Sequence, residues 1–189
     1  MKVTILHEGK SIDKDFFKLL YMHLGICEEK LKERVDFIGM GTKSNFFKLK
    51  NQNYRLLKSE IQREEVAKVL FIIDADYEKN DNIYGGYENT KIELEKIIKE
   101  LNLADCSDIC ITCDFDSKDG YLESLILSSI PQKQKECIEN FLKCSDFKSK
   151  ENDKAILNQI YKSAYPNAPY DFTSKYFDEL KQKLKNLFE

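Results

Sequence analysis

Val69-Leu-Phe-Ile-Ile-Asp-Ala-Asp76 is an apolar run that ends in two carboxylates one residue apart. Its first five residues are apolar and rich in Ile, Val and Phe, which is typical of a strand buried on both faces. Such strands belong to parallel sheets covered by helices. Ligands bind to open α/β sheets at the carboxyl ends of the strands. The stretch therefore predicts both a fold class and the edge of the sheet where a functional site would lie.

Three further segments have the residue pattern of strands, namely Lys2–Leu6, Val35–Ile38 and Ile109–Cys113. Segments with helical spacing or capping residues are expected from Ser11 or Asp13, within Thr42–Glu65, from Thr90, from Gly120, from Pro131, over Glu151–Ala164 and over Thr173–Phe188. We expect an α/β domain over residues 1–130, with a mainly parallel sheet of about four strands flanked by helices. Residues 131–189 are expected to form C-terminal helices packed on the same unit.

Two of these helices carry more detailed expectations. Thr90-Lys-Ile-Glu93 has the spacing of a capping box, which would start a helix at that point. Pro131 favours the start of a later helix, in which we expect Ile138, Phe141 and Leu142 to be buried.

The composition is that of a globular protein, with 42% hydrophobic and 33% charged residues. No apolar run approaches the roughly 18 residues that a membrane span needs. The sequence opens directly into a strand pattern without a signal-peptide pattern, so we expect a cytoplasmic protein with no membrane partner. A net charge of -3 gives no long-range attraction for nucleic acid, but it does not exclude an enzyme whose metal ions bridge to phosphate.

The cysteines are expected to be reduced thiols, because the chain has no sign of export. Cys110 and Cys113 have the Cys-x-x-Cys spacing of a zinc site. They fall within a predicted strand, however, where positions three apart face opposite sides. No second pair or histidine cluster supplies the remaining ligands, so structural zinc is not expected.

Carboxylates follow three of the predicted strands. Glu8 comes after the first strand, Asp74 and Asp76 after the central one, Asp114 and Asp116 after the last, and Glu123 lies in the first turn of the next helix. Oxygen ligands of this kind suit Mg²⁺ or Mn²⁺, and a shared cation offsets the repulsion between neighbouring acids. All six acids are therefore candidate metal ligands. The alternative interpretation is that they cap helices or are solvated in loops.

Two lysines are candidates for stabilising negative charge on a phosphate, namely Lys10, in the turn after the first strand, and Lys154. His7 has an ordinary pKa near neutrality and could transfer protons. If Glu8 faces the site, however, the alternation of side chains along a strand turns His7 away. The catalytic candidates are thus Glu8, Asp74, Asp76, Lys10 and Lys154.

An early strand followed by Glu8-Gly-Lys10 and a later strand followed by Asp74-Ala-Asp76 resembles the Toprim domain, whose signature is one glutamate after the first strand and an Asp-x-Asp after a later one. Leu122-Glu123-Ser124-Leu125 is similar to the additional acidic motif of the OLD-type nucleases in that family. The resemblance covers about residues 1 to 130 and is closest to short, stand-alone Toprim-like bacterial proteins. It implies a Toprim-like fold and a metal site at Glu8, Asp74 and Asp76.

The main hypothesis is a Toprim-type nuclease, a phosphodiesterase that acts on DNA or RNA with Mg²⁺ or Mn²⁺. It requires Glu8 to lie near the two aspartates, with no ion-paired lysine or arginine filling the space between them. A HAD-like phosphatase is one alternative, because Asp-x-Asp after an apolar strand is also its nucleophile motif. A non-catalytic Toprim-like binding module, with a protein partner or as a homodimer, is another.

Overall fold

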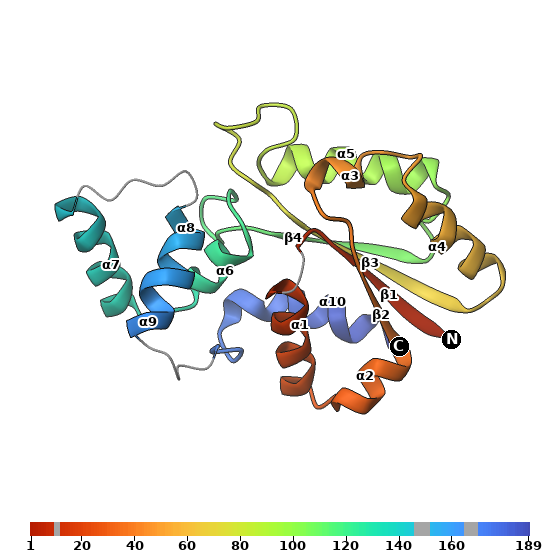
Figure 1. Cartoon of the computed structure of the whole chain (residues 1–189), viewed down its shortest axis with the longest axis horizontal. Coiled ribbons are helices and arrows are strands. Elements are labelled where there is room, and N and C mark those ends of the chain that lie inside the picture. Colours follow the sequence, from red (N-terminus) through yellow and green to blue (C-terminus); the bar gives the residue numbers. More distant parts are fainter. Residues whose placement is uncertain (10–11, 146–151, 165–169) are drawn as a thin grey trace.

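The computed structural model describes residues 1–9, 12–145, 152–164 and 170–189 (Figure 1). Its centre is a sheet of four parallel strands in the order β2-β1-β3-β4, formed by β1 (Lys2–His7), β2 (Val35–Gly39), β3 (Val66–Asp74) and β4 (Ser107–Thr112). The predicted α/β class and the four-stranded parallel sheet are confirmed. Because all four strands run in the same direction, their carboxyl ends lie at one edge of the sheet.

Helices cover both faces of this sheet (Figure 1). One face carries α1 (Ile12–His23), α2 (Glu28–Arg34) and α10 (Asp178–Asn186), and the other carries α3 (Lys43–Phe46), α4 (Gln52–Gln62) and α5 (Tyr87–Glu100). The burial of both faces explains why the central strand is apolar without interruption from Val69 to Ile73.

The central strand β3 divides its side chains between two cores. Leu70 and Ile72 pack on the face of α1 and α10, whereas Val69, Phe71 and Ile73 pack on the face of α4 and α5. Each of these five residues is at most 3% exposed. The alternation follows from the period of two along a strand, so the sequence of β3 alone sets which residues enter which core.

All six cysteines lie in the described part of the chain and are free thiols. Cys110 and Cys113 belong to cores on opposite faces of the sheet, as the strand pattern predicted, so they cannot share a zinc ion. Within the described residues, no helix is both long enough and apolar enough to span a membrane.

After β4 the chain forms α6 (Leu122–Ser128), α7 (Gln132–Cys144) and a longer helical segment made of α8 (Asn152–Ala155), a π-helical stretch (Ile156–Tyr161) and α9 (Lys162–Ala164). A 3₁₀ turn (Lys175–Phe177) then leads into α10. Phe177, Leu180 and Leu184 are at most 2% exposed and share a core with Val3 and Ile5 of β1. The last helix is therefore a structural part of the sheet domain.

Helix α7 differs from the sequence-based expectation. None of its residues, all of which are described, is buried, and Phe141 is 41% exposed. The predicted burial of Ile138, Phe141 and Leu142 is wrong, because α1, α6 and α10 already cover that face of the sheet. Helix α7 instead lies beside α8 and α9, away from the sheet (Figure 1).

Helix α5 begins earlier than the capping-box pattern predicted. Its first residue is Tyr87, which follows Gly86 with a φ of +82°. Thr90 is buried within the helix, and its hydroxyl lies 2.7 Å from the carbonyl oxygen of Tyr84 and 3.3 Å from that of Ala75. Thr90 therefore anchors the preceding loop to the end of β3, and its predicted role as the helix cap is wrong.

A backbone bridge joins the loops that leave β3 and β4. The N–H of Asp76 donates to the carbonyl oxygen of Gly120 at 2.8 Å, and the N–H of Gly120 donates to the carbonyl oxygen of Asp76 at 2.9 Å. Asp76 has a φ of +57°, in a left-handed region that is strained for residues with a side chain but that Asp enters more readily than most. The bridge holds Asp76 in this conformation.

Replacing Gly120 with alanine tests whether the bridge requires a residue without a Cβ at this position. An added Cβ would clash with the Ser124 Oγ and lie 2.9 Å from the Ser124 Cβ, at a φ of +99°. Rotation of the serine hydroxyl cannot relieve the second contact. We expect Gly120→Ala to lower the free energy of unfolding by about 2 to 4 kcal/mol, combining backbone strain with overpacking, as measured by urea denaturation.

Gly25→Ala is the matched control. Gly25 has a similar φ of +85°, but no described atom lies within 4 Å of a Cβ built there. This variant should carry only the backbone cost of about 1 to 2 kcal/mol. Equal losses in the two variants would contradict the steric explanation.

Candidate functional site

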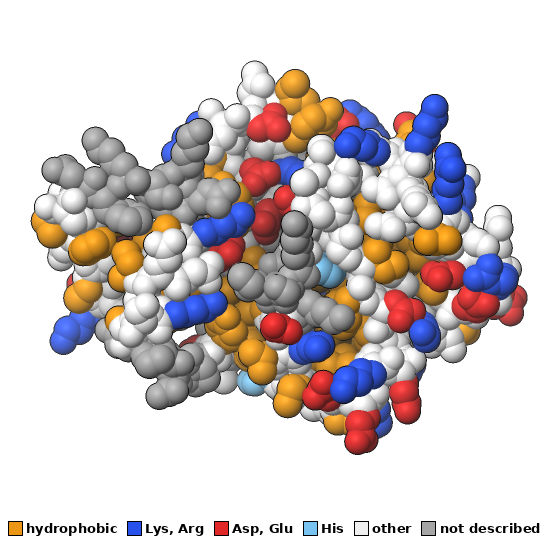
Figure 2. Space-filling view, viewed as in Figure 1, with side chains coloured by type: hydrophobic (Ala, Val, Ile, Leu, Met, Phe, Trp, Pro, Cys, Tyr) orange, Lys and Arg blue, Asp and Glu red, His pale blue; other side chains and the backbone are white. Residues whose placement is uncertain are grey.

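The carboxyl ends of β1, β3 and β4 are neighbours, and predicted acids follow each of them. β3 pairs with β1 on one side, where His7 is opposite Ile72, and with β4 on the other, where Asp74 is opposite Thr112. Glu8 and the turn after β3 therefore leave the sheet side by side. Figure 2 shows acidic side chains gathered near the middle of the face in view, between the α3–α5 side and the α6–α9 side of the molecule.

The Glu8 carboxylate is largely buried. Its Oε2 is shielded from solvent and has no hydrogen-bond partner among the described residues. The pKa of Glu8 is raised from its ordinary 4.5 to about 7, first by burial and second by the negative charge of Asp76. The charges of Lys43 and Lys154 and a hydrogen bond from the Lys43 backbone oppose this rise without cancelling it. When ionised, Glu8 therefore carries a charge that the described residues around it do not balance.

Lys43, the first residue of α3, brings a cation to the same place. It is only 8% exposed, and its Nζ donates to the carbonyl oxygen of Ala75 at 2.5 Å and forms an ion pair with the Asp76 Oδ2 at 3.2 Å. The Ala75 oxygen also accepts the N–H of Gly86 at 2.9 Å. The ammonium is thus held against the turn that carries the Asp-x-Asp motif.

The segment after β2 places Lys43 beside Glu8. The backbone N–H of Gly41 donates to the carbonyl oxygen of Glu8 at 3.1 Å, so the chain follows the end of β1 before it turns into α3. At the other end of this short helix, Phe46 is fully buried, and its carbonyl oxygen accepts the Tyr54 hydroxyl at 2.6 Å. Both ends of α3 are therefore fixed, and the position of Lys43 is fixed with them.

Sequence reasoning did not single out Lys43. The signal was present in the Gly39-Met40-Gly41 turn, which ends a strand shortly before the lysine. Since the carboxyl ends of parallel strands meet at one edge, a lysine after the second strand belongs with acids after the first and third. What the sequence lacked was the strand order, which puts β2 directly beside β1.

Asp74 has a different role from Asp76. Its Oδ1 accepts the hydroxyl of Thr112 at 2.6 Å and the backbone N–H of Leu122, the first residue of α6, at 2.9 Å. Asp74 therefore ties the start of α6 to the ends of β3 and β4. Asp76, the second aspartate of the motif, pairs with Lys43 and raises the pKa of Glu8.

Asp114 accepts hydrogen bonds from its own loop and from α6. Its Oδ1 accepts the N–H groups of Asp116 at 3.0 Å and Ser117 at 2.9 Å, and its Oδ2 accepts the Ser128 hydroxyl at 2.7 Å. Burial raises the pKa of Asp114, but these hydrogen bonds outweigh burial and the net pKa is lowered. The contacts favour the capping interpretation of Asp114, and the Asp116 side chain is exposed.

Lys154, on α8, lies near the acidic pair. Its Nζ is 4.2 Å from the centre of the Tyr121 ring, and its charge lowers the pKa of Glu8. Tyr121 in turn makes an edge-to-face contact with Tyr77, the residue after Asp76, with ring centres 5.5 Å apart. The fold thus brings a lysine from the C-terminal helices toward the strand ends.

The other two candidates are less closely connected with this pair. Glu123 is half-buried in the first turn of α6, directly after the residue whose N–H binds Asp74. Burial raises the pKa of Tyr170, and the charge of Glu123 adds to that rise. Lys10 lies outside the described residues.

Glu8, Asp76 and Lys43 form the centre of the candidate site. Within residues 1–9, 12–145, 152–164 and 170–189, no three His, Cys, Asp or Glu side chains are close enough together to hold one ion. The described acids therefore make a pair and not a complete cage. Mg²⁺ commonly binds through one or two carboxylates and keeps several waters, so a pair is a sufficient donor set for it.

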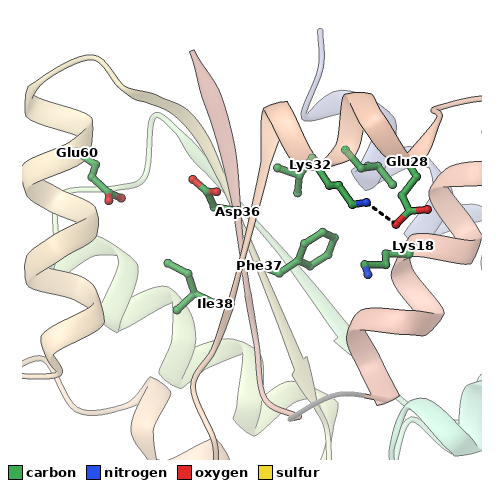
Figure 3. A pocket seen from close by; sticks show the side chains of 9 residues that line it. Lys18, Glu28, Lys32, Asp36, Phe37, Ile38 and Glu60 are labelled. Atoms are coloured by element: carbon green, nitrogen blue, oxygen red, sulfur yellow. Dashed lines mark ion pairs between the residues drawn. The ribbon is translucent and has the colours of Figure 1, made fainter.

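A separate hollow of about 470 Å³ lies beside β2, at an edge of the sheet (Figure 3). Its lining includes Lys18, Glu28, Lys32, Asp36 and Glu60, and the Lys32 Nζ pairs with the Glu28 Oε1 at 3.0 Å. None of the described site candidates lines this hollow. This hollow is therefore separate from the acids at the strand ends.

Comparisons of the chain with models of protein families, with curated proteins and with solved structures found no match. The Toprim resemblance therefore stays a prediction that rests on the motif residues. The function has to be inferred from the geometry at the strand ends.

The raised pKa of Glu8 predicts a specific dependence of stability on pH. Because the folded pKa of about 7 exceeds the ordinary 4.5, the contribution of Glu8 to stability is fully present below pH 4.5 and is lost as the pH rises through 7. Glu8→Gln mimics the protonated acid. At pH 8 in EDTA it should have a free energy of unfolding higher than wild type by up to about 3 kcal/mol, and the difference should shrink toward pH 5.

Glu100→Gln is the control. Glu100 is exposed at the end of α5, away from the strand-end site, and its replacement removes one negative charge, as Glu8→Gln does. Urea denaturation of the three proteins at pH 5 and pH 8 measures the effect. A pH-independent difference between Glu8→Gln and wild type would show that Glu8 is not held in a poorly solvated, negatively charged place.

Proposed function

We propose that this protein is a phosphodiesterase that depends on Mg²⁺ or Mn²⁺ and acts on DNA or RNA, a nuclease of the Toprim type. The observation that carries the proposal is the pairing of Glu8 and Asp76 at the carboxyl edge of the sheet, with the Glu8 Oε2 buried and without a hydrogen-bond partner among the described residues. Two ionised carboxylates in a poorly solvated place are unfavourable unless one takes up a proton or a cation shares them.

The donor set suits a hard divalent cation. Both groups are carboxylates, and the remaining positions around Mg²⁺ are usually filled by water and by substrate phosphate. Bound at this pair, the ion would polarise a phosphoryl oxygen and lower the pKa of a bound water, which is the chemistry that phosphodiester hydrolysis needs.

The chain's own residues have distinct roles in this proposal. Glu8 and Asp76 hold the ion, and Asp74 fixes the start of α6 through the N–H of Leu122. Lys154 supplies positive charge near Glu8 that can stabilise a phosphate during reaction. Lys10 keeps the same predicted role.

The proposal is limited to one ion. A second ion at Asp114, Asp116 and Glu123 has less support, because both oxygens of Asp114 already accept hydrogen bonds within the loop and α6. The HAD-like alternative, with Asp74 as the nucleophile, also has less support, because the Asp74 Oδ1 is used by Thr112 and Leu122.

One observation favours a second candidate function, the non-catalytic binding module. The ammonium of Lys43 pairs with Asp76, whereas the nuclease hypothesis requires that no ion-paired lysine fills the space between Glu8 and the aspartates. In the module, Lys43 would permanently take the place of the metal ion. Against this, the pKa of Glu8 stays raised although the charges of Lys43 and Lys154 lower it.

Nuclease activity should depend on Asp76. Wild-type protein with Mn²⁺ or Mg²⁺ should cleave a mixed set of labelled single- and double-stranded DNA and RNA, and Asp76→Asn should reduce the rate more than about a hundredfold through loss of the ion. The measurement is product formation on denaturing gels over time.

Asp105→Asn is the matched control for this experiment. Asp105 is exposed and lies just before β4, at the opposite edge of the sheet, so the variant should cleave at the wild-type rate. If wild type cleaves no substrate with either metal, or if Asp76→Asn cleaves as fast as wild type, the proposed function is wrong.

A further inference from the structure

Lys43 is unusual among the lysines whose side chains the structure describes. It is 8% exposed, its Nζ has the Ala75 carbonyl as one partner and the Asp76 carboxylate as the other, and its charge lowers the pKa of Glu8. A lysine is rarely buried to this degree unless it is paired. The ammonium therefore belongs to the acidic pair and is not a solvated surface charge.

The ammonium and a divalent ion would need the same carboxylate. An ion held by Glu8 and Asp76 would approach the Asp76 Oδ2, which lies 3.2 Å from the Lys43 Nζ. Two cations this close repel each other strongly in a poorly solvated site. Binding of the ion must therefore weaken the ion pair, and the ion pair must weaken binding of the ion.

We propose that Lys43 is an internal counter-ion that competes with the divalent cation for Asp76. This inference rests on the proposed metal site at Glu8 and Asp76. In the ion-free protein, Lys43 offsets the repulsion between the two carboxylates and keeps them together. When the ion binds, it displaces the ammonium from Asp76, so Lys43 sets the concentration at which the site fills.

The test compares Mn²⁺ binding by wild type and Lys43→Met, measured by isothermal titration calorimetry. Methionine keeps the length and much of the apolar volume of the lysine stem but removes the charge. We expect Lys43→Met to bind Mn²⁺ at least about tenfold more tightly, because the competing cation is gone. We also expect a larger rise in its melting temperature when EDTA is replaced by Mn²⁺, since tighter binding gives more stabilisation.

Lys48→Met is the matched control. Lys48 is exposed, lies five residues later, and donates to the side chain of Asn45 at 3.0 Å. The variant changes the net charge of the protein by the same amount, so it should bind Mn²⁺ with the wild-type affinity. Lys43→Arg keeps the positive charge and should not bind more tightly than wild type.

A measurement on the wild-type protein keeps the proposal testable if Lys43→Met does not fold. In protein labelled with ¹⁵N-lysine, titration with diamagnetic Mg²⁺ should shift the slowly exchanging ammonium signal of the buried lysine in step with binding. A signal that stays constant while the site saturates would overturn the counter-ion role.

The outcomes separate this inference from the proposed function. Binding of Mn²⁺ by wild type with unchanged affinity in Lys43→Met overturns the counter-ion role and leaves the metal site in place. If Lys43→Met binds Mn²⁺ and wild type does not, the counter-ion role is supported. The wild-type protein would then be the non-catalytic binding module, with Lys43 in the place of the metal ion. If neither protein binds Mn²⁺, both the metal site and the inference that rests on it are wrong.

Discussion

Parallel pairing of β3 with a strand on each side is the constraint on which the structure depends. β1 and β4 hold β3 between them, and helices on both faces exclude water from it, so every residue from Val69 to Ile73 is buried. The first polar side chains after this run appear where three strands end together. Acids that are far apart in the sequence are therefore neighbours in the fold, and their repulsion has to be balanced locally.

The positive charges of the described residues near Glu8 and Asp76 do not fully balance the two carboxylates, and the strand ends therefore favour binding of a cation. Glu8 and Asp76 would together carry two negative charges, and Lys43 contributes one positive charge at close range. Lys154 acts on Glu8 from the C-terminal helices, yet the pKa of Glu8 remains near 7. Excess negative charge of this kind favours a site that exchanges an ammonium for a divalent ion, because the ion has to bind more favourably than the lysine it displaces.

The fold class and the place of the site could be predicted because both follow from one local pattern, an apolar run that ends in acids. Two features of the structure could not be predicted from the sequence. Lys43 depends on the strand order, which no local pattern contains. The exposure of α7 depends on the prior coverage of one sheet face by α1, α6 and α10, so an amphipathic pattern that usually indicates burial does not produce it here. Likewise, Thr90 had the spacing of a cap, but its hydroxyl bonds to Ala75 and Tyr84 within the fold.

The two aspartates of the motif also show where a sequence pattern stops being informative. Along a regular strand, residues two apart face the same side, so Asp74 and Asp76 would be equivalent. The φ of +57° at Asp76 ends the strand geometry and separates them: Asp74 supports α6, while Asp76 turns to Lys43 and Glu8. Such a conformation persists only when its surroundings hold it, and here Gly120 does so through two backbone hydrogen bonds. The acidic pair therefore depends on a glycine that carries no functional group, because only a residue without a Cβ fits against Ser124 and still pairs with Asp76.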